Sequence, residues 1–392
     1  MIYSIFVDKD ATIYSGSSDV VNSVGIQNTG LDEILEIEKL DVTALEELGK
    51  PKGVENFTLS RALLKFDLAE VSRSIVNGNI GTNIRFYLNL YAVEADEIPL
   101  SYTLYAYPLS QSWNMGVGRK HDFPVINDGV TWFWTDTSGS TTWSGSMYGG
   151  VYMTGSGGNT YAASQSFEYE SSDIRMDVTD IVRFWLSCSL NTGWNYLQQK
   201  YVEGLNTENH GIILKRAGSE ETDLLSYGSL KFFSRDSHTI YQPKLEVCWD
   251  DSTWSVGSLT AIDSDEDIVL YMKGLKKEYK ENSKTKFRVI GRERYATKLF
   301  ASSSALYINP YSTITYLPTS SYYSIRDAKT EEVIIPFDDN YTKLSCDSNG
   351  NYFNLWLDGL QPERYYRFVF KVERSSTTEE YFDNGFIFKV VK

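Results

Sequence analysis

The chain has 392 residues, a formal net charge of −15 and a sequence pI near 4.8. Its content of 42% hydrophobic and 14% aromatic residues is sufficient for packed cores and excludes a disordered chain. The excess of negative charge repels phosphate backbones and anionic lipid, so we expect no direct contact with nucleic acid or with a membrane.

The opening segment, residues 1–15, has no basic region, apolar run or cleavage site of a secretory leader, so we expect synthesis and folding in a cytoplasm. No stretch approaches the roughly 18 consecutive apolar residues of a membrane span. The three cysteines are far apart in the sequence. They fit small buried hydrophobic side chains in a reduced compartment better than a disulfide framework.

A hydrophobic period of two dominates the chain and predicts an all-β fold. The strand-like segments either alternate or run apolar: 84–91, 103–107, 211–215, 244–249 and 365–372. Two short segments favour helix instead, residues 41–48 and residues 177–185. In the second, spacing places four side chains on one face of a helix that would pack against a sheet: Val178, Ile181, Val182 and Trp185.

The strand-rich segments fall into two blocks. The first covers residues 1–250, a linker rich in acidic residues follows at 251–267, and the second block covers residues 268–392. The second block has about seven strand-like runs at the spacing of a β-sandwich. The first block is large for one sandwich, and its surplus is an insertion at about 113–167 that is rich in Gly, Ser, Thr, Trp and Tyr.

The insertion contains the candidate functional residues. Aromatic side chains stand there among small polar residues: Trp132, Trp134, Trp143, Tyr148, Tyr152 and Tyr161. Three interpretations stay open: a satellite hydrophobic core, an interface with another subunit, and a platform on which sugar rings stack.

The order of motifs in the first block resembles the β-sandwich domain named for its DNRLRE consensus. The motifs are Asp10–Ile13, Ser60–Leu68, the strand 84–91, the helical segment Met176–Trp185, Asn209–Lys215, Phe232–Asp236 and Gln242–Val247. The resemblance implies a jelly-roll-like sandwich of the kind found in bacterial surface proteins and phage structural proteins. Some relatives in that family bind polysaccharide.

Three segments of the second block resemble the closing domain of neck and tail proteins from crAss-like and related phages of gut Bacteroidota: Ser321–Ala328, Ile334–Asp338 and Leu360–Tyr366. In the last of these, a turn, a proline and a strand with a tyrosine near its start are typical of the tyrosine corner of immunoglobulin-like domains. The second block is therefore predicted to be an Ig-like sandwich.

Sequence motifs give no reason to expect an enzyme. The three histidines are isolated, and there is no phosphate-binding loop and no Gly-x-Ser-x-Gly elbow. Carboxylates are too numerous for a catalytic pair to be identified by counting. We predict no catalytic, cofactor-binding or metal site.

These observations predict a structural protein of a bacteriophage virion, made in the host cytoplasm. We expect a ring or collar component of the neck or tail that contacts copies of itself and other virion proteins. The alternative is a carbohydrate-binding adhesion module or receptor-binding tail module, for which a polysaccharide would be the partner.

Overall fold

Strands are the main elements of the computed structural model, and the predicted all-β fold is confirmed. The structure describes residues 1–16, 24–41, 57–81, 83–144, 148–156, 159–168, 171–189, 194–195, 200–201, 208–262, 267–295, 315–375 and 378–392. The chain forms two compact units. The N-terminal unit comprises residues 5–247, and the C-terminal unit comprises residues 1–4 together with 248–392.

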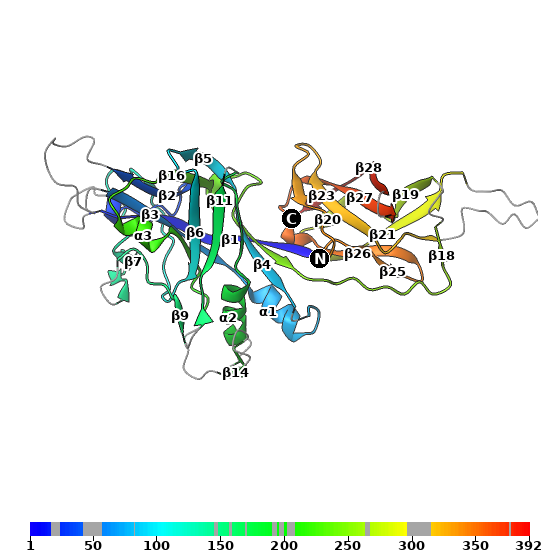
Figure 1. The fold of residues 1–392 in the computed structure, drawn as a ribbon, viewed down its shortest axis with the longest axis horizontal. Coiled ribbons are helices and arrows are strands. Elements are labelled where there is room, and N and C mark those ends of the chain that lie inside the picture. Colours follow the sequence, from blue (N-terminus) through cyan, green and yellow to red (C-terminus); the bar gives the residue numbers. More distant parts are fainter. Residues whose placement is uncertain are drawn as a thin grey trace, which may run out of the picture. The chain divides into compact units, whose positions relative to one another are not determined.

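One sheet organises the N-terminal unit (Figure 1). Its strands neighbour one another in the order β11 (Ala163–Glu168), β6 (Ser101–Pro108), β15 (Ile212–Arg216), β3 (Phe57–Phe66), β1 (Ile2–Tyr14), β17 (Lys244–Cys248), β4 (Arg85–Leu90) and β12 (Ile174–Asp177). A branch from β3 adds β2 (Ile34–Asp41), β16 (Gly228–Phe233) and β5 (Ala92–Asp96).

The two ends of this sheet meet. The Gln165 side chain in β11 donates a hydrogen bond to the carbonyl of Asp173 at 3.2 Å and accepts one from the N–H of Arg175 at 2.8 Å. The Gln165 side chain thus connects β11 to β12, the strand at the opposite end of the sheet. The sheet wraps around its core as in a closed sandwich, and this closure covers strand edges that would otherwise pair with another chain.

Strand β15 is buried on both faces, which explains why its first three residues are all apolar. Ile212 and Leu214 alternate with Ile213 along the strand, and all three are fully buried. Ile213 lies opposite Leu63 of β3, so these two side chains share the outer face of the sheet. That face is covered by the insertion described below.

Helix α2 (Thr179–Ser189) forms where the sequence predicted a helix, and its four predicted core side chains are all buried. Asp177 accepts a hydrogen bond from the N–H of Thr179 at 2.9 Å, which stabilises the first turn. Helices α1 (Ala69–Val76) and α3 (Gly218–Thr222) were not predicted. The predicted helix at 41–48 lies outside the described residues except for Asp41, which ends β2.

The C-terminal unit is a sandwich of two sheets. One has the order β18 (Thr260–Ala261), β22 (Thr315–Tyr316), β21 (Lys284–Glu293), β26 (Gly350–Trp356), β25 (Ser345–Asp347), with β19 (Ile268–Lys273) also paired to β21. The other has the order β20 (Glu278–Lys280), β28 (Thr378–Val391), β27 (Tyr365–Ser375), β23 (Ser321–Asp327), β24 (Val333–Ile335). The sequences β19-β21-β26-β25 and β28-β27-β23 correspond to the A-B-E-D and G-F-C sheets of immunoglobulin domains.

Aromatic rings fill the space between these two sheets. Phe353 in one sheet stacks on Tyr323 in the other with ring centroids 4.2 Å apart. Phe287 meets Phe368 edge to face at 4.9 Å, and Phe368 stacks on Phe388 at 4.6 Å. Rings in such geometries contribute packing energy beyond the area that they bury.

The predicted tyrosine corner is present. The Tyr366 hydroxyl donates a hydrogen bond to the carbonyl of Gln361, five residues upstream, at 2.8 Å. The Tyr366 ring is buried, with 2% of its surface exposed. This contact fixes the turn before β27 and is the feature by which the sequence identified an Ig-like sandwich.

Residues 1–4 complete the C-terminal unit. The ring of Tyr3 meets Trp356 edge to face at 5.1 Å, and its hydroxyl donates to Asp358 at 3.1 Å. The first residues of strand β1 therefore contribute to a core that is otherwise built from the second half of the chain.

Candidate functional site

The insertion packs on the outer face of the main sheet and forms a second core there. Its side chains Trp113, Met115, Val130 and Trp143 join Leu109 and the sheet residues Ala11, Ile13, Leu63 and Ile213 in one buried cluster. The insertion also contains the short hairpin of β7 (Trp134–Asp136) and β8 (Thr141–Thr142). The last residues of the predicted insertion, 163–167, form part of β11 in the main sheet.

A buried asparagine fixes the first loop of the insertion. The Asn28 side chain donates to the carbonyls of Met115 and Val130 at 2.8 and 2.9 Å, and it accepts from the N–H groups of Gly30 and Gly118 at 3.1 and 2.8 Å. Asn28 is 2% exposed. All four hydrogen-bonding capacities of this amide are used, so both ends of the loop are held at fixed positions.

Two glycines permit the close approach to Asn28. Gly116 and Gly129 have φ angles of +78° and +71°, and a Cβ at either position would lie within 2.6 Å of the Asn28 side chain. Only glycine adopts this backbone region without strain and leaves room for the amide.

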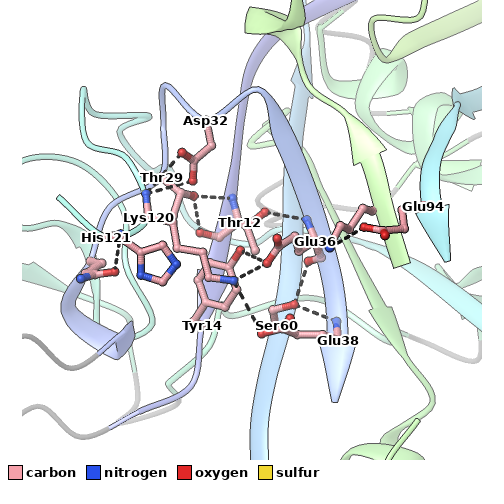
Figure 2. A network of polar contacts seen from close by, with 12 residues as sticks. Thr12, Tyr14, Thr29, Asp32, Glu36, Glu38, Ser60, Glu94, Lys120 and His121 are labelled. Atoms are coloured by element: carbon pink, nitrogen blue, oxygen red, sulfur yellow. Dashed lines mark hydrogen bonds and ion pairs between the residues drawn. The ribbon is translucent and has the colours of Figure 1, made fainter. Parts of the chain in front are cut away.

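A charged network attaches the same loop to strand β2 (Figure 2). The Lys120 ammonium donates to the Glu36 carboxylate and lies 3.9 Å from Glu38. It also lies 4.1 Å from the ring centroid of Tyr14, whose hydroxyl donates to Glu36 at 2.6 Å. The Lys120 N–H donates to Asp32. The Lys120 ammonium thus lies next to Glu36, Glu38 and Tyr14 of the sheet, and it holds the loop against the sheet.

Burial shapes the electrostatics of this network. Desolvation is the main cause that raises the pKa of Glu38, and the positive charge of Lys120 acts in the opposite direction. Desolvation, reinforced by the negative charge of Glu36, raises the pKa of Tyr14 well above its usual value. The carboxylates therefore depend on Lys120 for compensation.

The tip of this anchored loop carries apolar side chains into solvent. Phe123 is 82% exposed, Val117 56% and Ile126 36%. We call these three residues the loop tip. A large exposed aromatic side chain on a backbone held at both ends is typical of an interface anchor.

Two of the six candidate aromatic residues are core residues. Trp143 is 2% exposed, and its indole N–H donates to the carbonyl of Thr131 at 3.1 Å. Tyr161 is 1% exposed and stacks on Phe184 of α2 at 4.4 Å. The prediction that these two side chains face a partner or a glycan is wrong, because both are enclosed by their own chain.

Two others flank a buried phenylalanine. Trp134 and Tyr148 meet the Phe133 ring edge to face, at 5.7 and 4.9 Å. Trp134 is half-buried, whereas Tyr148 is 54% exposed. Of the six, Tyr148 is the candidate that presents most of its ring to solvent.

The remaining two lie beside tyrosines from strand β6. Tyr152 packs against Tyr107 at 4.9 Å, and Tyr107 stacks on Tyr105 at 6.2 Å with nearly parallel rings. Trp132 joins them through the Arg61 guanidinium, which lies 4.9 Å from its ring and 6.0 Å from that of Tyr152. We call Tyr105, Tyr107, Tyr152 and Trp132 the aromatic shelf. All four are half-buried and leave ring surface accessible.

An ion cluster supports the aromatic shelf. Arg61 pairs with Glu221 through two nitrogens at 3.1 and 2.8 Å, and Lys215 pairs with the same carboxylate at 2.6 Å. Lys215 also lies 5.3 Å from the ring of Tyr152. Sequence reasoning missed Tyr105, Tyr107 and these charges. The register could have found them, because Lys215 lies directly opposite Tyr105 on the outer face.

A buried carboxyl lies in strand β1. Asp10 is 1% exposed and accepts a hydrogen bond from the N–H of Arg235 at 2.8 Å. Burial raises its pKa to about 7, and the negative charge of Asp236 adds to the shift. Within the described residues, no group of three or more His, Cys, Asp or Glu side chains is arranged to hold a metal ion.

Two described cysteines, Cys248 and Cys346, are buried thiols. Burial raises the pKa of Cys346 to about 11, which keeps it protonated and unreactive at neutral pH. No helix in the described part of the chain is both long and apolar enough to cross a membrane.

The chain was compared with protein families, curated proteins and solved structures. No protein-family model and no curated protein matches the chain. Among solved structures, the adhesin domain of Epf from Streptococcus pyogenes aligns over 97% of this chain and 91% of its own, with 10% identity and a TM-score of 0.17. A TM-score this low carries no argument about fold or function.

Proposed function

We propose that this chain is a structural subunit of a bacteriophage virion, assembled in the host cytoplasm into a ring or collar of the neck or tail. Its partners would be copies of itself and neighbouring virion proteins. The observation that carries the proposal is the loop tip, where Phe123 is 82% exposed on a loop fixed by Asn28 and Lys120.

The loop tip is preorganised for contact with a neighbour. An exposed apolar side chain on a mobile loop loses more conformational entropy when it binds than one on a fixed loop, because the backbone must be ordered as well. Asn28 holds the backbone on both sides of the loop tip, so Phe123 can fill a pocket on a neighbour at low entropic cost. A contact in which the loop tip meets a different surface of the next copy closes into a ring when the rotation allows it.

The resemblance of the second block to phage neck and tail proteins supports the same proposal, as do the two sandwich units. Each unit is built on paired strands, which suits a protein that packs against its neighbours.

The test is the oligomeric state of the purified chain, measured by light scattering and by electron microscopy. We expect concentration-dependent rings, and we expect Phe123→Asp to leave a folded monomer. Val76→Asp is the matched control, because Val76 is 68% exposed on α1, away from the insertion. A chain that stays monomeric at every concentration, or rings that form equally well with Phe123→Asp, would contradict the proposal.

A second candidate function is glycan binding by the aromatic shelf. Tyr105 and Tyr107 project from one face of β6 and stack with their rings 12° from parallel, and the outer face of such a stack suits contact with a sugar ring. Binding of a host polysaccharide that is lost with Tyr105→Ala and kept with Tyr381→Ala would favour an adhesion module. Tyr381 is a suitable control because it is 60% exposed in the C-terminal unit.

A further inference from the structure

A row of four side chains crosses the outer face of one sheet in the C-terminal unit. Arg326 in β23 lies directly opposite Arg367 in β27. Val333 in β24 extends the row beyond Arg326, and Ile387 in β28 extends it beyond Arg367. Phe368 follows Arg367 and packs against the other sheet, so the alternation of side chains along a strand points the row outward. We call these four residues, Val333, Arg326, Arg367 and Ile387, the arginine row.

Exposed apolar side chains surround the two guanidinium groups. Val333 is 42% exposed and Ile387 is 46% exposed. Tyr365, two residues before Arg367 on the same face of β27, is 45% exposed. Arginine and tyrosine are enriched where protein surfaces meet, and neighbouring exposed apolar side chains mark such a surface better than scattered ones. The arginine row therefore has the composition of a protein–protein interface.

The two arginines of the row differ in their partners. Arg367 donates to Glu331 and lies 3.3 Å from Asp383. In the part of the chain that the structure describes, no carboxylate lies within ion-pair distance of Arg326. Arg326 is half-buried and its buried nitrogen is Nε, so the terminal nitrogens of its guanidinium are accessible. Like charges directly opposite each other are destabilising, so a carboxylate from outside would relieve this pair.

A partner for this surface needs a carboxylate beside an exposed apolar side chain. Three exposed apolar side chains of the N-terminal unit have a carboxylate next to them in the sequence: Val93, Phe123 and Leu224. The carboxylate beside the first, Glu94, is already paired with Lys231 at 2.6 Å. The carboxylate beside the last, Asp223, is paired with Lys39 at 2.6 Å. These two carboxylates are therefore less available to a second cation.

The third carboxylate, Asp122, has no such partner and lies beside Phe123. One of its oxygens accepts a hydrogen bond from the N–H of Arg119 at 2.8 Å, and no described cation lies within ion-pair distance of it. A carboxylate accepts several hydrogen bonds, so Asp122 can also accept from a guanidinium. Asn28 and Lys120 hold the backbone of this loop, so the carboxylate and the phenylalanine are presented together from a fixed position.

We propose that the arginine row receives the loop tip of the next copy of this chain, with Asp122 pairing with Arg326 and Phe123 packing on Val333. The inference rests on the proposed ring and identifies the surface that the loop tip contacts. The loop tip and the arginine row lie in different units of the chain, so the contact is heterologous and can repeat from copy to copy. Copies with a net charge of −15 repel one another, and the pairing of a carboxylate with an uncompensated guanidinium selects the orientation in which they associate.

The test mixes two variants of the full chain that each lose one of the two surfaces. Phe123→Asp removes the loop tip and keeps the arginine row, whereas Arg326→Glu keeps the loop tip and places a like charge opposite Asp122. Each variant alone should remain a monomer in light scattering. An equimolar mixture should form a 1:1 dimer of two 44.6 kDa chains and no ring, because each pair of chains can make only one contact.

The Arg326→Glu variant should fold, because it replaces a like-charge pair with Arg367 by an opposite-charge pair. Val333→Asp changes the same surface without altering either arginine and should behave in the same way. Arg326→Ala should raise the concentration of half-assembly about ten-fold. Lys273→Glu is the matched control, because it makes the same change of charge on an exposed side chain of β19 in the other sheet, and it should retain the rings.

Rings that depend on Phe123 but form equally well with Arg326→Glu and with Val333→Asp would overturn this inference and leave the proposed function in place. A mixture that contains only monomers would do the same. Loss of rings with Lys273→Glu as well would also contradict it, because net charge alone would then explain the result. A wild-type chain that stays monomeric at every concentration would overturn the proposed function and this inference with it.

Discussion

Replacing Asp10 with asparagine should stabilise the protein at neutral and alkaline pH. Asp10 is buried in β1, and its carboxylate accepts the N–H of Arg235 at 2.8 Å. Asparagine keeps an oxygen at that position and nearly the same volume. It removes a charge that burial and Asp236 both disfavour.

The magnitude follows from the pKa of Asp10, which is raised from 3.8 to about 7. Between these values the folded chain retains a proton that the unfolded chain has released, so the stability of the wild type falls as pH rises through that window. Above about pH 7 both states are ionised and the loss is complete. A shift of roughly three units corresponds to about 4 kcal/mol as an upper limit, and Asp10→Asn avoids that loss.

The assay is chemical denaturation of both chains at about pH 5 and about pH 8, which compares the pH dependence of their unfolding free energies. The stabilising effect of Asp10→Asn should be larger at the higher pH. Asp236→Asn should reduce the pH dependence of the wild type, because the charge that raises the pKa of Asp10 is removed. An effect of Asp10→Asn that is the same at both pH values would refute the reasoning.

Other consequences of the described contacts can be measured by thermal or chemical unfolding. Asn28→Ala should cost about 3 kcal/mol, since four buried hydrogen bonds are lost, and hydrogen exchange should become faster in residues 115–130. Lys120→Met should cost roughly 2 kcal/mol near pH 8 and less near pH 5, because burial raises the pKa of Glu38 and protonation of that carboxyl relieves the loss. Gly129→Ala should cost about 2 kcal/mol, because its φ is +71° and a Cβ would lie 2.4 Å from Gly116. Tyr366→Phe should cost about 1 kcal/mol and leave the insertion unaffected. An unchanged midpoint for any of these variants would contradict the role given to that contact.

The features that the sequence predicted well are local. Helix α2 was predictable because one face of a single segment carries its apolar residues, and its flanking Asp177 lies two positions from its partner Thr179. The tyrosine corner spans five residues, so Tyr366 could be identified from a short phrase.

The insertion was not predictable in the same way. Its position depends on Asn28 contacting backbone groups 87 to 102 residues away, and no periodicity encodes such a contact. The sequence located the aromatic residues in the insertion, but it could not separate Trp143, which is enclosed, from Tyr148, which is exposed. Which ring is buried is decided by the sheet face that the insertion covers.

The strand order of the main sheet also constrains the order of events during synthesis. Strand β1 ends at residue 14 and is made well before its neighbour β17, which ends at residue 248. At translation rates of about 5 to 20 residues per second, one edge of β1 stays unpaired for roughly 10 to 50 seconds. During that time the β17 segment of a neighbouring nascent chain is a chemically equivalent partner. Slower initiation on a shared message, which spaces the nascent chains apart, should therefore reduce strand-exchanged dimers among the products.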